Sequence, residues 1–175
     1  MIRILAISGS LRRESSNTAL LHALARVAPP GVDVVIYDRL EHLPFFNPDV
    51  LPSPEVAAFQ AAVGSCVAVV ISSPEYAHGV PGVLKNALDW LVGSGEFIDK
   101  PVALLNASSR ATYAWNSLME TLTVMSARVI EEASIIVPLD GTRLGAAAIA
   151  TDPQRSALLG AALEALSRHV SIRST

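Results

Sequence analysis

The chain has 175 residues, of which 51% are apolar, and a formal net charge of −3. This length suits one domain with a sizeable core, so we expect residues 1–175 to form a single domain, and the apolar content excludes an intrinsically disordered chain. The small negative charge gives no indication of a nucleic acid or a membrane as partner. The single cysteine, Cys66, excludes an internal disulfide and a multi-cysteine metal site, so no metal is expected.

The first apolar run, at residues 2–8, is predicted to be a strand. It lacks the length and the small-residue cleavage site of a signal peptide. No apolar run in the chain reaches the roughly 18–20 residues that a membrane helix needs. We therefore expect a cytoplasmic location.

Further runs of strand length alternate with segments in which apolar residues recur at helical spacing. In chain order, the remaining predicted strands are residues 32–37, 66–73, 101–108 and a last region that divides into 128–130 and 134–138. Runs one, three and four are almost wholly apolar, which is typical of strands buried on both faces of a parallel sheet. Glu131 and Glu132 divide the last region, and they predict a kink or a sheet edge.

The predicted helices fill the intervals between the strands. Their expected starts lie at Asn17 as N-cap, at Ser53-Pro54, after Pro81, near Ala111 and after Asp152-Pro153. Strict alternation of this kind predicts an α/β fold in three layers, with a five-stranded parallel sheet of order 2-1-3-4-5 and helices on both faces. A closed eightfold barrel would need about 250 residues. The irregular stretch 38–53 is long enough to indicate a functional loop or a cover for a site.

The loop after the first strand has the composition of an anion-binding loop. Residues 8–18 (SGSLRRESSNT) combine hydroxyl groups and two arginines with the start of a helix. Free N–H groups at a helix N-terminus attract anions, and a guanidinium adds paired donors. Neither G-x-G-x-x-G nor G-K-[ST] is present, which favours a terminal phosphate such as that of FMN. A capped helix start with solvated arginines is the alternative.

The loop after the third strand, residues 74–82 (PEYAHGVPG), is rich in proline and glycine. Its exposed backbone suits contact with a planar heterocycle, against which Tyr76 can stack. His78 could donate to a flavin carbonyl or to a hydride acceptor. The alternatives are a turn-rich connector and a histidine without a catalytic role.

Together these motifs resemble the NADPH-dependent FMN reductase family. The resemblance covers residues 2 to about 128 and rests on four motifs: SGSLR at 8–12 with Ser16-Asn17, SPEY at 73–76, Pro81-Gly82 and LKNALDWL at 84–91. That family has a flavodoxin-like fold and includes quinone, azo-dye and chromate reductases. The resemblance implies FMN as cofactor, NADPH or NADH as reductant, and a homodimer or homotetramer.

The resemblance also implies roles for individual residues. Around the FMN phosphate it places Ser10, Arg12, Ser16, Asn17 and Thr18. Along the ribityl chain and the isoalloxazine edge it places Pro74, Glu75, Tyr76 and Ala77, with Ser108 as a further contact. Two departures stand out: many relatives have Asn where this chain has Ala77, and glycines where this chain has residues 108–113.

The function expected from these features is that of an NAD(P)H-dependent, FMN-containing oxidoreductase. Hydride would pass from NAD(P)H through FMN to a quinone, a free flavin or a similar small acceptor in a ping-pong reaction. FMN would carry the chemistry, so no catalytic side chain is expected beyond assistance from His78. Arg13 and Arg110 are candidates for the phosphates of NAD(P)H, with solvated surface as the alternative. A flavodoxin-type electron carrier and a flavin-bound regulatory module are the competing interpretations, and a charge of −3 argues against the carrier.

Overall fold

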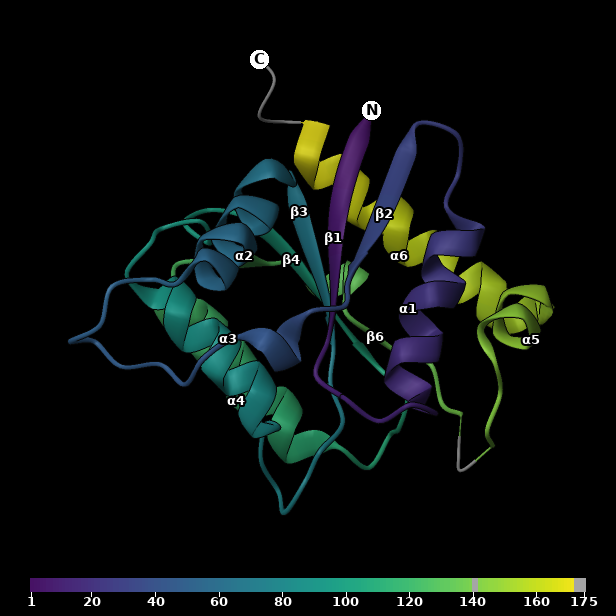
Figure 1. Cartoon of the computed structure of the whole chain (residues 1–175). Coiled ribbons are helices and arrows are strands. Elements are labelled where there is room, and N and C mark those ends of the chain that lie inside the picture. Colours follow the sequence, from purple (N-terminus) through teal and green to yellow (C-terminus); the bar gives the residue numbers. More distant parts are fainter. Residues whose placement is uncertain (140–141, 172–175) are drawn as a thin grey trace.

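A parallel β-sheet lies at the centre of the computed structural model, which describes residues 1–139 and 142–171 (Figure 1). The strands are β1 (Ile2–Ser8), β2 (Val32–Tyr37), β3 (Ala68–Ser72), β4 (Pro101–Asn106), β5 (Arg128–Val129) and β6 (Ile135–Ile136). The α-helices are α1 (Ser16–Val27), α2 (Pro54–Ser65), α3 (Gly82–Val92), α4 (Thr112–Val124), α5 (Ala146–Thr151) and α6 (Pro153–Ser171). Short 3-10 helices span Leu40–His42 (η1) and Glu131–Ala133 (η2).

The predicted strand order is confirmed, with one refinement at the last strand. The sheet runs β2-β1-β3-β4-β5, and its paired strands are parallel. Within the described residues the fifth strand is present as two short pieces, because η2 separates β5 from β6 and both pair with β4. Glu131 and Glu132 therefore mark an interruption at the sheet edge, as the sequence indicates.

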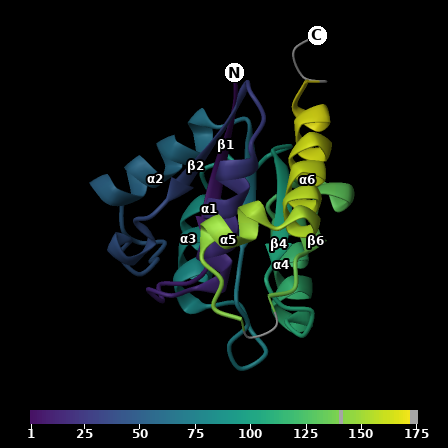
Figure 2. The same cartoon turned by 90° about the vertical axis from the view of Figure 1, so that its right-hand side faces the viewer.

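Successive residues of the central strands point to opposite faces and enter two separate cores. Leu5 and Ile7 of β1 pack with α2, α3 and α4, whereas Ile4 and Ala6 pack with α1, α5 and α6. Figure 1 shows these two helical layers on either side of the sheet, and Figure 2 looks onto the layer that contains α1, α5 and α6. This alternation explains why β1, β3 and β4 are apolar at almost every position.

Helix starts follow local side-chain chemistry, with one correction to the prediction. Asn17 is not the N-cap of α1. Ser15 has the extended backbone of an N-cap, and its Oγ accepts from the Thr18 N–H at 3.3 Å. The prediction for α2 is confirmed, because Ser53 Oγ accepts from the Val56 N–H at 3.4 Å.

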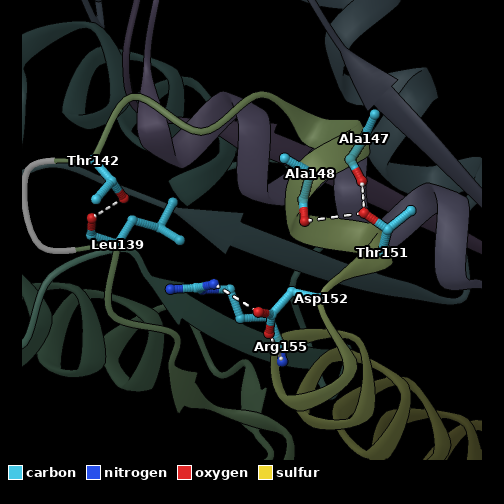
Figure 3. A network of polar contacts seen from close by, with 7 residues as sticks. All are labelled: Leu139, Thr142, Ala147, Ala148, Thr151, Asp152 and Arg155. Atoms are coloured by element: carbon cyan, nitrogen blue, oxygen red, sulfur yellow. Dashed lines mark hydrogen bonds and ion pairs between the residues drawn. The ribbon is translucent and has the colours of Figure 1, made fainter.

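The connection between β6 and α6 contains a helix that the sequence analysis did not predict (Figure 3). The hydroxyl of Thr151 donates to the carbonyls of Ala147 and Ala148 at the end of α5. The carboxylate of Asp152 then accepts from the Arg155 N–H at 2.8 Å and pairs with the Arg155 guanidinium at 3.0 Å. These contacts begin α6 at Asp152-Pro153, as predicted. Among the helices of the described residues, none has both the length and the apolar character needed to cross a membrane.

The long loop 38–53 is fastened to α3. Asn86 Oδ1 accepts from the Phe46 N–H at 2.7 Å, and Asn86 Nδ2 donates to the Pro44 carbonyl at 3.0 Å. Trp90 Nε1 donates to the same carbonyl at 2.8 Å, and its ring meets the Phe46 ring edge-on. The loop is therefore held by specific contacts although it is mostly without regular structure.

Candidate functional site

Three buried polar residues lie where apolar strands end, on one edge of the sheet. Ser8 ends β1, Ser72 ends β3 and Asn106 ends β4. In Figure 1 this edge is the lower one, where the loops after these strands emerge. In open α/β sheets, ligands bind outside the carboxyl ends of the strands where the strand order reverses. Here the chain passes from β1 outward to β2 and returns to β3, so the reversal lies between β1 and β3.

Hydrogen bonds from its own hydroxyl groups fix the conformation of the loop after β1. Ser8 Oγ lies 2.7 Å from Thr18 Oγ1 and accepts from the Ser10 N–H at 3.3 Å. Ser10 Oγ in turn accepts from the Arg12 N–H at 3.2 Å. This arrangement leads the loop into the N-terminus of α1, where the first N–H groups have no partner within the helix. The loop is thus organised by hydrogen bonds within the chain.

Gly9 lies where the loop after β1 closely approaches the loop after β3 and the first turn of α3. Its N–H donates to the Ser72 carbonyl at 2.8 Å. A Cβ at this position would lie 2.8 Å from Ser73 Oγ and 3.0 Å from Leu84 Cδ2, which is too close for any other residue without movement. A second tie between β3 and the first loop comes from Asn17, whose Oδ1 accepts from Ser72 Oγ at 2.9 Å. Because this bond uses the amide oxygen, Asn17 can offer an anion its NH₂ group.

The loop after β3 ends in a tight turn. The backbones of Tyr76 and Gly79 exchange two hydrogen bonds, and the turn residues Ala77 and His78 have φ angles of 49° and 60°. Such left-handed backbone is more readily adopted by Asn than by Ala. Asn would therefore adopt this turn more readily than Ala77 does.

The same loop is attached to the start of α4. Glu75 Oε2 accepts from the Ala114 N–H at 2.9 Å. The His78 ring stacks on that of Tyr113, with centroids 4.3 Å apart and an interplanar angle of 13°. His78 is therefore engaged by an aromatic neighbour, and the side chain of Glu75 is engaged by a helix.

The loop after β4 is organised by Asn106, which the sequence analysis missed. Asn106 Oδ1 accepts from the Ser108 N–H at 3.0 Å, and Nδ2 donates to the Ala111 carbonyl at 3.1 Å. Ser108 Oγ accepts from the Arg110 N–H at 3.3 Å. A polar residue at the end of a buried apolar strand, in line with Ser8 and Ser72, is the signal that could have identified Asn106.

Several of the predicted residues meet in one cavity of about 340 Å³, called here the central cavity. It is lined by Ser16, Asn17, Pro74, Glu75, Asn106, Ala107, Ser108, Arg110, Ala111 and Leu139. Residues from the start of α1 and from the loops after β3 and β4 thus face a common space. Its volume lies in the range of small-molecule sites.

The other predicted residues lie around this cavity. Ser10, Arg12 and Thr18 line a neighbouring cavity of about 330 Å³ that reaches the end of β2. Burial raises the pKa of Tyr37, which lines this second cavity. Tyr76 is 56% exposed, and Ala77 is also exposed.

The two arginines considered for dinucleotide phosphates do not share a site. Arg13 lines a third cavity, of about 540 Å³, beside Arg143, whereas Arg110 lines the central cavity. Within the described part of the chain, no group of three or more His, Cys, Asp or Glu side chains is placed to hold a metal ion.

The donor set around the central cavity fits a phosphate-bearing flavin. The hydroxyls of Ser10 and Thr18 in the second cavity, the hydroxyl of Ser16 in the central cavity and the N-terminus of α1 supply donors for an anion. Pro74 and Ser108 also line the central cavity, where loop backbone is available to a heterocycle.

Fold and site together define a doubly wound α/β protein of flavodoxin type. The family model for NADPH-dependent FMN reductase matches residues 2–141, and the chain belongs to this family. An NAD(P)H-dependent FMN reductase of Pseudomonas aeruginosa is 33% identical over 147 residues, covering 78% of this chain and 77% of that protein. A 2-hydroxy-1,4-benzoquinone reductase from a Burkholderia species is 39% identical over 112 residues, covering 61% of each chain.

Solved structures agree on the fold. The flavoenzyme NAD(P)H:(acceptor) oxidoreductase of Paracoccus denitrificans superposes with a TM-score of 0.77 at 23% identity, covering 98% of both chains. At that identity the similarity establishes the fold alone. It confirms that the flavodoxin-like architecture extends over almost the whole chain.

Proposed function

We propose that this chain is an NAD(P)H-dependent, FMN-containing oxidoreductase that reduces a quinone, a free flavin or a similar small acceptor. The observation that carries the proposal is the central cavity, where the loops after β3 and β4 meet the N-terminus of α1. Membership in the NADPH-dependent FMN reductase family supports the cofactor and the reductant. The names of the relatives from Pseudomonas and Burkholderia support flavin and quinone acceptors.

The residues proposed to hold FMN fall into two groups. Ser10, Arg12, Ser16, Asn17 and Thr18 are proposed to bind the phosphate, because their hydroxyl, amide and guanidinium donors surround the N-terminus of α1. Pro74, Glu75, Tyr76, Ala77 and Ser108 are proposed to border the ribityl chain and the ring system. When bound, FMN supplies two-electron hydride chemistry, and the protein supplies position and electrostatic environment.

The test is a flavin titration followed by turnover. Purified chain is titrated into FMN while flavin fluorescence is recorded, and NADPH or NADH oxidation is then followed with 1,4-benzoquinone as acceptor. We expect saturable FMN binding and quinone-dependent oxidation, and the ratio of kcat/KM values for the two nucleotides gives the preferred reductant. FMN binding without turnover on quinone or free flavin would overturn the reductase and favour an electron carrier or a regulatory module.

The proposal extends to assembly and location. We propose that the protein is a homodimer or homotetramer in the cytoplasm. Its partner is proposed to be a small-molecule electron acceptor rather than a nucleic acid or a membrane. The exposed apolar side chains of Phe45, Val50 and Leu51 belong to one loop, 38–53, and they support self-association because surfaces rich in such groups often mark a protein contact.

A further inference from the structure

The N-terminus of helix α4 is capped by a side chain from the loop after β3. Its N-cap residue, Ala111, makes no side-chain capping bond, as its methyl group requires. The N–H of Ala114, the third residue of α4, is a donor that an N-cap side chain ordinarily accepts. Glu75 Oε2 fills this role at 2.9 Å from a position 39 residues earlier in the chain. A carboxylate at this place also interacts favourably with the positive end of the helix dipole.

Two more contacts hold the same pair of segments in place. The His78 ring stacks on Tyr113 in the first turn of α4, and Asn106 Nδ2 binds the Ala111 carbonyl just before that turn. Residues 75–78 are therefore attached to α4, and the start of α4 is attached to β4. Glu75 and Ala111 both line the central cavity, so the bond from Glu75 joins two of its walls.

We infer that Glu75 is a positioning residue for the flavin site, whose carboxylate fixes the loop after β3 against α4 and so sets the width of the central cavity. This inference rests on the proposed function and assigns the Glu75 side chain to α4 rather than to direct contact with FMN. Loss of the Glu75–Ala114 bond lowers the fraction of molecules in which the two walls are correctly spaced. The apparent dissociation constant for FMN rises in inverse proportion to that fraction.

The experiment compares variants at Glu75 with a matched cap removal elsewhere. Glu75→Ala deletes the acceptor, Glu75→Gln keeps an amide oxygen at the same place, and Ser53→Ala deletes the N-cap acceptor of α2. FMN affinity is measured by fluorescence quenching on the apoprotein, thermal stability by circular dichroism, and protection of residues 74–79 by amide hydrogen exchange.

We expect Glu75→Ala to raise the FMN dissociation constant roughly 5- to 30-fold, as the loss of one or two kcal/mol would. Exchange in residues 74–79 should accelerate in the same variant without flavin present. Glu75→Gln should recover most of the affinity. Ser53→Ala should lower the melting temperature by about 2–4 °C, as a cap worth about 1 kcal/mol would, and leave the FMN dissociation constant unchanged.

Distinct outcomes separate this inference from the proposed function. Wild-type protein that binds FMN, together with a Glu75→Ala variant of equal affinity, overturns the inference alone. A Glu75→Gln variant as weak as Glu75→Ala also overturns it, because the hydrogen bond to the Ala114 N–H, which an amide oxygen can still accept, would then not be what holds the loop. Wild-type protein that does not bind FMN overturns both. If Glu75→Ala does not fold, Glu75→Asp replaces it, and an unchanged dissociation constant for that shorter carboxylate counts against the inference.

Discussion

Arg12 and Arg13 are adjacent in the sequence, yet they line different cavities. Arg12 lines the cavity that Ser10 and Thr18 also line, whereas Arg13 lines another cavity together with Arg143. Only Arg12 belongs to the residues that the family resemblance places around the phosphate. The two arginines therefore form a natural pair for separating a specific phosphate bond from the general attraction of positive charge.

The first prediction concerns this pair. We expect Arg12→Ala to weaken FMN binding by about 1.5–3 kcal/mol, because a charge-assisted bond to the phosphate is lost. Arg13→Ala is the matched control and should change the affinity much less. Both affinities are measured by isothermal titration at two salt concentrations. Equal losses for the two variants, disappearing at high salt, would show that Arg12 contributes charge but no specific bond.

At the residue scale, features that depend on neighbouring residues could be predicted from the sequence, whereas contacts between distant residues could not. The hydroxyl-rich loop 8–18 and the Ser53 cap could be predicted because they depend on neighbours within a few residues. The side-chain bond between Asn17 and Ser72 spans 55 positions, and nothing in either local sequence indicates it. Asn17 was consequently predicted as an N-cap, although Ser15 takes that role once Asn17 turns toward β3.

At the scale of elements, the alternation of apolar runs predicted the order of strands and helices, but every strand after the second was predicted longer than it is. The run 66–73 was predicted as one strand, whereas β3 spans Ala68–Ser72. Cys66 is buried as the C-cap of α2 and Val67 is 44% exposed, so the apolar run begins before the strand does. Helix α5 was missed because six residues, Ala146–Thr151, are too few to show a helical period.

The second prediction concerns the attachment of loop 38–53 to α3. Asn86→Ala removes both bonds to the loop backbone, at Phe46 N–H and the Pro44 carbonyl, and should lower the free energy of unfolding by about 1–2 kcal/mol. Lys85→Ala is the control. It removes only an exposed pair with Asp89 and should cost less than about 0.5 kcal/mol.

Chemical denaturation gives the two stabilities, and amide hydrogen exchange locates the change. Protection should fall around residues 44–47 in Asn86→Ala and stay unchanged in Lys85→Ala. Uniform acceleration of exchange over the whole chain would contradict a local anchoring role for Asn86.

At the scale of the whole molecule, the two apolar cores account for most of the buried side chains, but apolar groups also remain outside. In loop 38–53, Phe45 is 93% exposed and Leu51 is 88% exposed, although the loop is anchored by specific contacts. An ordered loop that presents large apolar side chains to water is typical of a surface that another protein covers. A second copy of this chain is the partner that the family resemblance implies.

The third prediction is that the protein associates through this loop. Light scattering at micromolar concentration should give about twice or four times the chain mass of 18.5 kDa. The double variant Phe45→Ser/Leu51→Ser should return the mass to that of one chain while its circular dichroism stays native, because these side chains contribute little to either core. Val124→Ser provides the control, since Val124 is 71% exposed on α4, and it should leave the association unchanged. A monomeric wild-type chain would contradict the prediction. A double variant that stays associated would place the interface elsewhere. The reason is that a stable interface buries roughly 1,200–2,000 Å² and should not survive the loss of its apolar centre.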